Sequence, residues 1–465
     1  MDGQVAGSFR DPSGFLFRKA GVLYRQINQC YQQDYKQLID SRLHRDLVDS
    51  GFLVSHQPTD LEPLTEQGFL VVQPEPITSI SYPYEWCFSQ LKDAALLTLE
   101  IQSLAIAKNM SLKDASAYNV QFHNGKPIFI DTLSFESYEE GAPWMAYQQF
   151  CRHFLAPLAL MSLTDIRMGQ ILRTNIAGIP LDMASKLLPF RTKLGISLGI
   201  HIHLHARAQR KSAARGVIKK QRKGSFSKTA FLALINSLQS AINRLNWEPT
   251  GTEWHDYYLG NNNYSNSSLD YKDSVIKEFV QRVGPELVWD MGANTGRYSR
   301  IAASVSKLVC SWDIDPACVE INYRNVVEHN EKRILPLLLD LANPSPAIGW
   351  GNEERLSLKE RGGVDMVLAL GLVHHLVIAN NTPMAKLADY FSDIGRSVIV
   401  EFVPKSDSQV KKLLASRIDI FTEYDQAHFE EIFARHFEIE DCRHIPDTER
   451  RLYLLTRKHD RTPLG

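Results

Sequence analysis

The chain has 465 residues, of which 44% are hydrophobic and 23% are charged, and its formal net charge at pH 7 is −1. This length is enough for two or three domains with cores of their own, and the composition excludes a disordered chain. The small net charge excludes a global field that would indicate binding to nucleic acid or to a membrane.

Cysteine usage and the N-terminal residues indicate the compartment. The six cysteines are scattered without a C-x-x-C pair, which fits reduced thiols better than a disulfide framework or a zinc site. Residues 1–15 contain no apolar signal core, and no window holds 18 continuous apolar residues. We therefore expect a cytoplasmic protein without a transmembrane segment.

The first pattern in chain order lies in residues 80–135. A helix is predicted over Phe88–Lys108, and two short strands joined at Asn124-Gly125 have the signature of a hairpin. Asp114 and Asn119 precede the hairpin, and Asp131 ends its second strand.

This order resembles the catalytic loop and metal-binding acid of the kinase and phosphotransferase fold. The resemblance implies an α+β, kinase-like domain in which Asp114 orients a hydroxyl nucleophile, while Asn119 and Asp131 hold Mg²⁺ with ATP. Leu112 stands where the family has histidine, Arg25 stands in place of the lysine, and no G-x-G-x-x-G loop is present. Three alternatives stay open: an accessory fold that binds substrate or scaffolds the chain, an active phosphotransferase, and a coincidence.

A basic run divides the chain. Residues 207–228 contain nine basic residues and no acidic one, with Gly and Ser and without an apolar period. We interpret the run as an exposed linker, with a site for an anionic partner (phosphate, RNA or lipid headgroups) as the alternative. His201, His203 and His205 precede it, and its positive charge disfavours a metal at these histidines. The predicted domains are residues 1–206 and 229–465, joined by the linker 207–228.

After the linker, an amphipathic helix is predicted around Leu232–Leu245, and an aromatic segment with Trp254, Tyr257 and Tyr258 follows. Strand and helix patterns then alternate, which argues for a doubly wound α/β sheet. The predicted strands are residues 287–292, 308–315, 334–340, 364–370, 397–404, 437–445 and 450–458.

Acidic and glycine residues gather where these strands end. Residues 288–296 read V-W-D-M-G-A-N-T-G, a strand that ends in Asp290 and turns through Gly292 and Gly296. The spacing is D-x-G-x-x-x-G rather than the dinucleotide fingerprint G-x-G-x-x-G. The turn either holds a ligand or simply joins strand to helix.

The next two strands end in acids as well. Asp313 is placed to bind a ribose diol, whereas Asp315, directly before Pro316, fits a helix cap. Asp340 could accept a hydrogen bond from an adenine amino group or lie in solvent.

The fourth strand ends in Leu370 and Gly371 and is followed by His374 and His375. A histidine at this edge could line an acceptor pocket or take a proton. Adjacent residues are expected to face different ways, so at most one of the two is expected to function.

Together these motifs resemble class I S-adenosylmethionine-dependent methyltransferases over residues 250–458. The resemblance implies a Rossmann-like, doubly wound seven-stranded sheet. It also implies that Asp290, Gly292, Asn294 and Gly296 bind the methionine part of the cofactor, Asp313 the ribose and Asp340 the adenine. Leu370 and Gly371 would line the region near the sulfonium.

Methyl transfer requires chiefly that acceptor and methyl group be aligned, and a base only where the acceptor must lose a proton. His374 or His375 is the first candidate for that base and Glu401 the second. Trp254, Tyr257 and Tyr258 could cover the cofactor or simply pack.

The sequence thus predicts a methyltransferase acting on a saccharide, glycolipid or other small molecule, with an N-terminal kinase-like domain for recognition or scaffolding. A bifunctional kinase–methyltransferase, a non-catalytic binding or scaffold protein and an RNA methyltransferase are the alternatives. Nucleic acid is the less expected partner, and the sequence does not indicate the oligomeric state.

Overall fold

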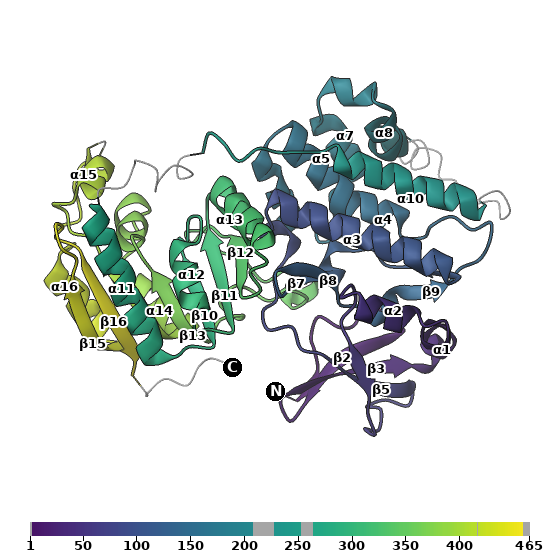
Figure 1. Cartoon of the computed structure of the whole chain (residues 1–465), viewed down its shortest axis with the longest axis horizontal. Helices are drawn as coiled ribbons and strands as arrows, with labels where there is room; N and C mark the ends of the chain where they lie inside the picture. The colour runs from purple at the N-terminus through teal and green to yellow at the C-terminus, as the bar shows by residue number, and fades with distance from the viewer. Residues whose placement is uncertain (1, 208–226, 253–263, 416, 459–465) are drawn as a thin grey trace. The chain divides into compact units, whose positions relative to one another are not determined.

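The computed structural model of the chain describes residues 2–207, 227–252, 264–415 and 417–458 (Figure 1). The chain folds into two compact units. The first unit comprises Met1–Glu248 together with Ile348–Arg355, and the second comprises Pro249–Ala347 and Leu356–Gly465. Both units combine helices with sheet, so the α/β class is confirmed. Nearly all of the predicted linker 207–228 lies outside the described residues.

The first unit begins with a five-stranded antiparallel sheet in the order β1-β2-β3-β5-β4. The elements of this part are β1 (Gly3–Gln4), β2 (Gly14–Lys19), β3 (Val22–Asn28), α1 (Gln32–Asp40), α2 (Leu43–Asp49), β4 (His56–Pro58) and β5 (Gly68–Pro74). Ile27, Tyr35, Val72 and Leu133 belong to one buried cluster, so the sheet packs on the segment that follows the hairpin.

A predominantly helical part follows. Helix α3 (Phe88–Ala107) begins at the predicted residue and ends one residue earlier than predicted, which confirms it. The hairpin is confirmed too, because β7 (Val120–His123) and β8 (Lys126–Phe129) are joined by Asn124 and Gly125, both with positive φ. The other elements are β6 (Met110–Leu112), β9 (Phe135–Ser137), α4 (Tyr147–Phe150), α5 (Ala156–Leu163), α6 (Ile171–Thr174), α7 (Leu181–Leu187), η7 (Phe190–Lys193), α8 (Ile196–Leu198) and η8 (Gly199–Leu204).

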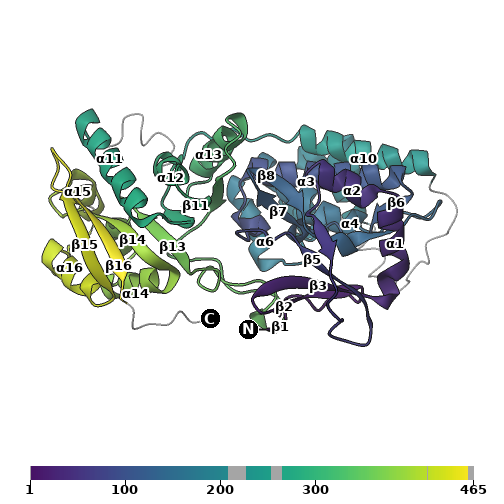
Figure 2. The ribbon, with the colours of Figure 1, turned by 60° about the horizontal axis from the view of Figure 1, so that its bottom comes forward.

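Helix α10 (Lys228–Asn243) corrects the predicted domain boundary. It lies along α3 in Figure 1 and in Figure 2 and is part of the first unit. Its apolar stripe, including Ile235 and Leu238, is buried there, and Lys92 of α3 donates to the carbonyl of Leu245 at 2.9 Å. The boundary therefore lies after Glu248 rather than at residue 229. Amphipathic periodicity predicted the helix, but it does not reveal which core the apolar face joins.

The second unit contains a seven-stranded mixed sheet in the order β12-β11-β10-β13-β14-β16-β15. The first five strands of that order are parallel, and β16 runs antiparallel to both of its neighbours. The elements are α11 (Asn266–Val283), β10 (Leu287–Met291), α12 (Arg297–Ala303), β11 (Leu308–Asp313), α13 (Pro316–Glu328), β12 (Ile334–Leu338), β13 (Val364–Ala369), η11 (His375–Ala379), α14 (Met384–Ile394), β14 (Gly395–Phe402), α15 (Ser408–Leu414), α16 (Gln426–Ala434), β15 (Phe437–His444) and β16 (Arg451–Arg457).

The strand order reverses direction at β10, which pairs with both β11 and β13. Right-handed crossovers in opposite directions place α12 and α13 on one face of the sheet and α14 on the other. In a doubly wound sheet, ligands bind outside the carboxyl ends of the strands at such a switch point. The ends of β10, β11 and β13 are therefore the place to search for a site. Among the described residues, no helix combines the length and apolar character that crossing a bilayer requires.

Candidate functional site

The turn after β10 is built by residues with positive φ. Gly292, Asn294 and Gly296 have φ values of 79°, 51° and 84°. The amides of Gly292 and Ala293 both donate to the carbonyl of Trp312 at 2.9 Å, which anchors the turn to β11. A Cβ on Gly296 would lie 2.5 Å from Asn322 Oδ1, so this position excludes a side chain.

Asp290 lies one residue before the end of β10 and is only 2% exposed. The Ser299 hydroxyl lies 2.6 Å from Asp290 Oδ2 and 2.8 Å from the Ser311 hydroxyl, to which Asn322 donates at 2.8 Å. Burial raises the pKa of Asp290 to about 7, and the nearby Asp313 adds to the rise. The structure gives Asp290 no ion-pair partner among the described residues.

Asp313 ends β11 and lies beside the turn. It accepts hydrogen bonds from the amide of Asn294 at 2.7 Å and from the amide of Asp315 at 2.9 Å. Burial raises the pKa of Asp313 to about 6, against the lowering effect of these hydrogen bonds. Asp315 instead caps α13, since its side chain accepts from the amide of Ala317. The structure therefore confirms Asp315 as the helix cap and places Asp313 beside the turn, while the ribose role of Asp313 stays a prediction.

The remaining predicted cofactor residues also lie at strand ends. Asp340 follows β12, and its carboxylate accepts from the amide of Ala342 at 2.9 Å. Leu370 and Gly371 follow β13, and Gly371 has a φ of 62°. A Cβ on Gly371 would meet only Glu401 Oε2, at 3.7 Å, and one on Gly292 would meet only Leu372 Cδ1, at 3.5 Å, among the described residues. Backbone at both strand ends thus adjoins open space.

These residues fit S-adenosylmethionine by their chemistry. Two largely buried carboxylates, to which no described residue forms an ion pair, can accept hydrogen bonds from an ammonium group and from a ribose diol, and the glycine backbone allows a ligand to approach closely. Asp290, Asp313, Gly292 and Gly371 would hold the cofactor. Trp254, Tyr257 and Tyr258 lie outside the described residues.

His374 directly precedes the short π-helix η11, and His375 is its first residue. Their ring centroids are 4.2 Å apart, so the expectation that the two side chains face apart is wrong. Successive residues of a helical turn are separated by about 100°, not by the alternation of a strand, so their rings can touch. Burial lowers the pKa of both, that of His374 to about 3, and Nδ1 of His374 has no hydrogen-bond partner among the described residues. Both rings are neutral at pH 7.

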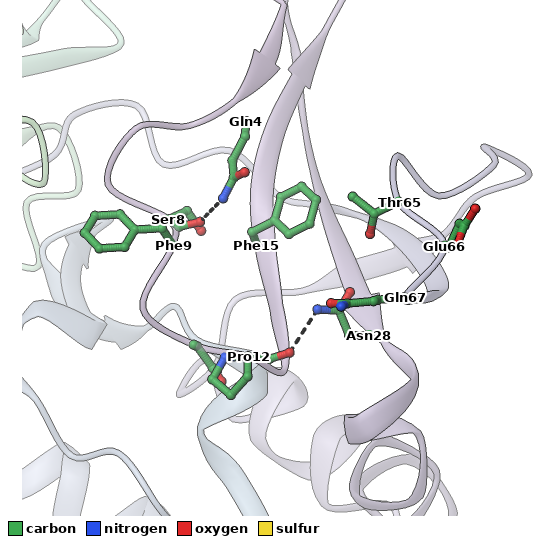
Figure 3. A pocket seen from close by; sticks show the side chains of 10 residues that line it. Gln4, Ser8, Phe9, Pro12, Phe15, Asn28, Thr65, Glu66 and Gln67 are labelled. Atoms are coloured by element: carbon green, nitrogen blue, oxygen red, sulfur yellow. Dashed lines mark hydrogen bonds between the residues drawn. The ribbon is translucent and has the colours of Figure 1, made fainter.

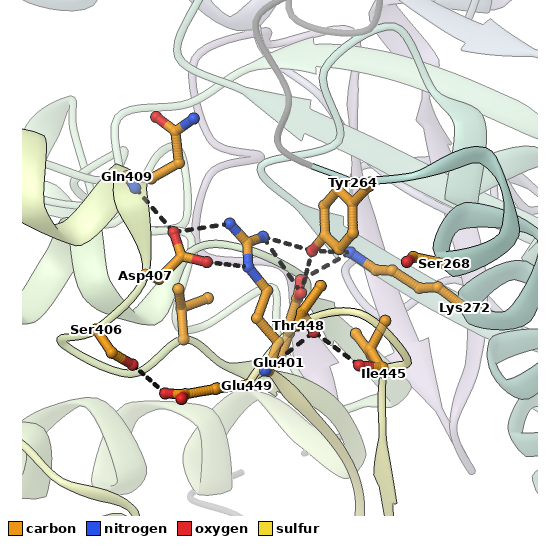
Figure 4. A network of polar contacts seen from close by, with 12 residues as sticks. Tyr264, Ser268, Lys272, Glu401, Ser406, Asp407, Gln409, Ile445, Thr448 and Glu449 are labelled. Atoms are coloured by element: carbon orange, nitrogen blue, oxygen red, sulfur yellow. Dashed lines mark hydrogen bonds and ion pairs between the residues drawn. The ribbon is translucent and has the colours of Figure 1, made fainter.

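Glu401 lies at the centre of a buried ionic network (Figure 4). Lys272 donates to Glu401 at 2.7 Å, Tyr264 donates to it as well, and Arg450 approaches it at 3.5 Å while pairing with Asp407 at 2.8 Å. Burial alone would raise the pKa of Glu401, but Lys272 and Arg450 lower it to about 2. A carboxylate paired in this way is a poor base, which argues against the predicted role of Glu401.

In the first unit, the predicted residues Asp114, Asn119 and Asp131 also lie together, but here a basic side chain neutralises one of the acids. Asn119 donates to Ser134, whose hydroxyl donates to Asp131, and Asn119 also contacts Asp114. Arg25 of β3 forms an ion pair with Asp131. Burial on its own raises the pKa of Asp131, but Arg25 and Ser134 outweigh it and the net pKa is lowered. Among the described residues, no group of three or more His, Cys, Asp and Glu side chains could hold a metal ion.

A cavity of about 480 Å³ lies beside the five-stranded sheet of the first unit (Figure 3). Phe9, Phe15, Asn28, Thr65 and Gln67 are among its lining residues, which include two acids and no lysine or arginine. Such a lining does not suit the phosphates of a nucleotide.

Sequence reasoning missed the partners that hold these acids: Ser299, Ser311 and Asn322 around Asp290, and Lys272, Arg450 and Asp407 around Glu401. No spacing rule identifies them, because they come from separate elements. For Arg25 the sequence did carry a signal, because the predicted kinase-like order places it where a phosphotransferase has its lysine.

The chain was compared with known proteins. No protein-family model matches it. It is 36% identical over 463 residues to nodulation protein NoeA of Rhizobium meliloti (strain 1021), covering 98% of this chain and 96% of that protein.

Solved structures also match the chain. N-methyltransferase NodS from Bradyrhizobium japonicum WM9, in complex with S-adenosyl-L-homocysteine, matches with 9% identity, a TM-score of 0.33, and 44% of this chain and 93% of that chain covered. Magnesium protoporphyrin IX methyltransferase from Synechocystis PCC 6803 matches with 17% identity, a TM-score of 0.31, and 44% and 98% covered. WbdD matches with 17% identity, a TM-score of 0.29, and 46% of each chain covered. All three TM-scores lie below 0.5, so an assignment of function rests on the strand order and on the residues of the site.

Proposed function

The chain belongs to the family of nodulation protein NoeA, and we propose that it is an S-adenosylmethionine-dependent methyltransferase. One observation supports this most strongly. Asp290 and Asp313 lie buried at the carboxyl ends of adjacent parallel strands, beside a glycine turn, and their pKa values are raised to about 7 and about 6. Buried acids without an ion-pair partner cost stability, so a site for a ligand gives a reason for keeping them.

Each residue has a defined role in this proposal. Asp290 accepts from the ammonium of the methionine part, Asp313 accepts from the ribose hydroxyls and Asp340 from the adenine amino group. The turn from Gly292 through Asn294 to Gly296 provides backbone that the ligand can approach, and Leu370 and Gly371 line the reacting side. When bound, the cofactor supplies an electrophilic methyl group on a sulfonium.

Where the acceptor must lose a proton, a neutral histidine is the base we propose. His375 is half-buried, whereas His374 is 2% exposed, so His375 is more accessible to an acceptor and His374 packs against it. Glu401 acts instead as a positioning residue, because its carboxylate is already occupied by Lys272 and Tyr264.

We propose a small-molecule acceptor, a saccharide or glycolipid among the candidates, with the first unit serving recognition or scaffolding. The ion pair between Arg25 and Asp131 argues against an active phosphotransferase, since the guanidinium takes the charge that Mg²⁺ would supply. The bifunctional alternative is therefore the weaker one.

Calorimetry tests the cofactor site. The wild-type protein should bind S-adenosylmethionine, and Asp313→Ala should weaken binding at least about 100-fold, because two charged hydrogen bonds are lost. Asp315→Asn, two residues away, is the matched control: asparagine also caps helices, so its affinity should stay within about twofold. An absence of binding by the wild type would favour the scaffold alternative.

A methyl-labelled cofactor incubated with cell extract tests the acceptor class. Label should enter small, protease- and nuclease-resistant molecules with the wild type and not with Asp313→Ala. Label that nuclease releases would instead favour the RNA alternative.

A further inference from the structure

Large apolar side chains gather on the outside of the first unit. Phe190 and Leu194 are 71% and 77% exposed, Leu204 is 55% exposed, and Leu187 and Ile200 are exposed as well. They lie on α7, η7 and η8 or directly beside them, and these elements contact one another. Single exposed apolar residues are ordinary, but here five lie within residues 187–204, on or beside elements that contact one another, and we call these five residues the apolar patch.

Buried hydrogen bonds connect the elements that carry these apolar residues. We call α7, η7 and η8 together the outer layer. His203 bonds to Ser185 of α7 at 2.7 Å and to Thr192 of η7 at 2.8 Å. His201 bonds to Tyr147 at 2.7 Å and to Ser237 of α10 at 2.9 Å. Both histidines are buried, and burial lowers the pKa of each. The polar bonds thus hold the layer from within and leave its apolar side chains outside.

The charged residues of residues 183–247 are all basic. Lys186, Arg191 and Lys193 are exposed among the apolar residues. In the sequence, the 65 residues between Asp182 and Glu248 contain 13 Lys and Arg and no acid. The described part of this stretch thus places Lys186, Arg191 and Lys193 in the same short segment as the exposed apolar residues.

We propose that this apolar and basic surface, residues 186–204, docks on a lipid bilayer with anionic headgroups. Exposed Leu and Phe can enter the boundary between headgroups and acyl chains, while Lys and Arg bind the negative surface potential. Neither signal alone is strong, and their combination is what gives stable peripheral attachment. A nucleic acid would use the cations but would gain little from exposed leucines, so the lipid surface is favoured.

Vesicle flotation with the full chain tests this proposal. The probes are vesicles of phosphatidylcholine alone and vesicles with about a third phosphatidylglycerol. The wild type should float with the anionic vesicles at low salt and bind at least about tenfold less to the neutral ones. Phe190→Ser combined with Leu194→Ser should reduce binding to anionic vesicles at least about tenfold. Ile418→Ser, which removes an 85% exposed apolar side chain of the second unit, is the matched control and should float like the wild type.

Three results would overturn the proposal. One is an absence of flotation by the wild type, and another is equal loss of flotation in the control. The third is flotation unaffected by the Phe190 and Leu194 changes, which would mean attachment by charge alone. Binding of an RNA oligonucleotide without flotation would assign the cations to nucleic acid. Circular dichroism of each variant checks that the fold is kept.

Discussion

Each unit of the molecule brings aspartates to the ends of strands, and the two units treat them in opposite ways. In the first unit, Asp131 is paired with Arg25 and bonded by Ser134, and its pKa is lowered. In the second, Asp290 and Asp313 are held by a hydroxyl and by backbone amides, and their pKa values are raised. The first carboxylate has an ion-pair partner from its own chain, whereas the residues that the structure describes supply none to the other two.

This difference shows how a binding site can be recognised from its energetics. A buried acid that is already neutralised contributes to the stability of the fold and offers little to a ligand. A buried acid that is held but not neutralised costs stability at neutral pH, and a ligand can repay that cost by binding. By this criterion we propose that the second unit binds the ligand, whereas Arg25 already neutralises the acid of the first unit.

The largest effect on stability is expected from breaking the buried ion pair between Arg25 and Asp131. Arg25→Met should destabilise the chain by about 2–4 kcal/mol at pH 7, because it leaves Asp131 largely buried and unpaired. Urea unfolding measures this, and the double variant with Asp131→Asn should recover most of the loss. Arg45→Met, which breaks an exposed pair with Asp49, should cost no more than a few tenths of a kcal/mol. A loss that Asp131→Asn does not recover would show that the pair is not what closes the cluster.

Removing the charge of Asp290 should have the opposite effect and stabilise the protein. The pKa of Asp290 is raised to about 7 in the folded state, so the stability from its protonated form is present below about pH 4 and is lost as the pH rises through 7. Asp290→Asn should therefore stabilise the protein by about 2 kcal/mol at pH 8 and by much less at pH 5. Urea unfolding at both pH values checks this. Equal changes at both pH values would contradict the raised pKa.

Cofactor affinity should follow the same titrations. Ionised carboxylates bind an ammonium group and a diol best, and Asp313 has a pKa of about 6. The affinity for S-adenosylmethionine should rise about tenfold from pH 5.5 to pH 7.5, with proton release on binding. Calorimetry at pH 6.5 in two buffers of different ionisation enthalpy measures that release. Asp313→Asn should flatten the profile, and a profile that falls with pH would exclude these acids as ligands.

The smallest effect is expected from two glycine substitutions, which distinguish the cost of backbone strain from a loss of cofactor binding. Gly292→Ala and Gly251→Ala both place a side chain at positive φ, at 79° and 75°, and each should cost about 1 kcal/mol of stability. Only the change at Gly292 should weaken cofactor binding, because only that glycine lies beside Asp290. Thermal unfolding and calorimetry on the two variants test this. Equal affinities would place the ligand elsewhere.

Much of the fold could be predicted because its signals are local. Apolar runs predicted the five parallel strands of the second unit, and residues 437–445 and 450–458 were candidates for the last two. Periodicity and turn chemistry predicted α3 and the hairpin at Asn124-Gly125. The cap at Asp315 followed from the proline after it. The choice of partners could not be predicted in this way. Tyr264, Lys272, Glu401 and Arg450 come from separate elements, and nothing in their spacing indicates that they meet.

The sequence by itself determined the strands, the glycine turn after β10 and the acids that end its neighbouring strands, because period, turn residues and chain order are local properties. Only the tertiary structure decided which acids are neutralised. Arg25 reaches Asp131 across 106 residues, and Lys272 reaches Glu401 across 129, whereas no ion pair to Asp290 or Asp313 occurs within the described part of the chain. The free energy of a buried charge depends on what surrounds it in space, so a strand-end acid that binds a ligand and one that stabilises the fold look alike in the sequence.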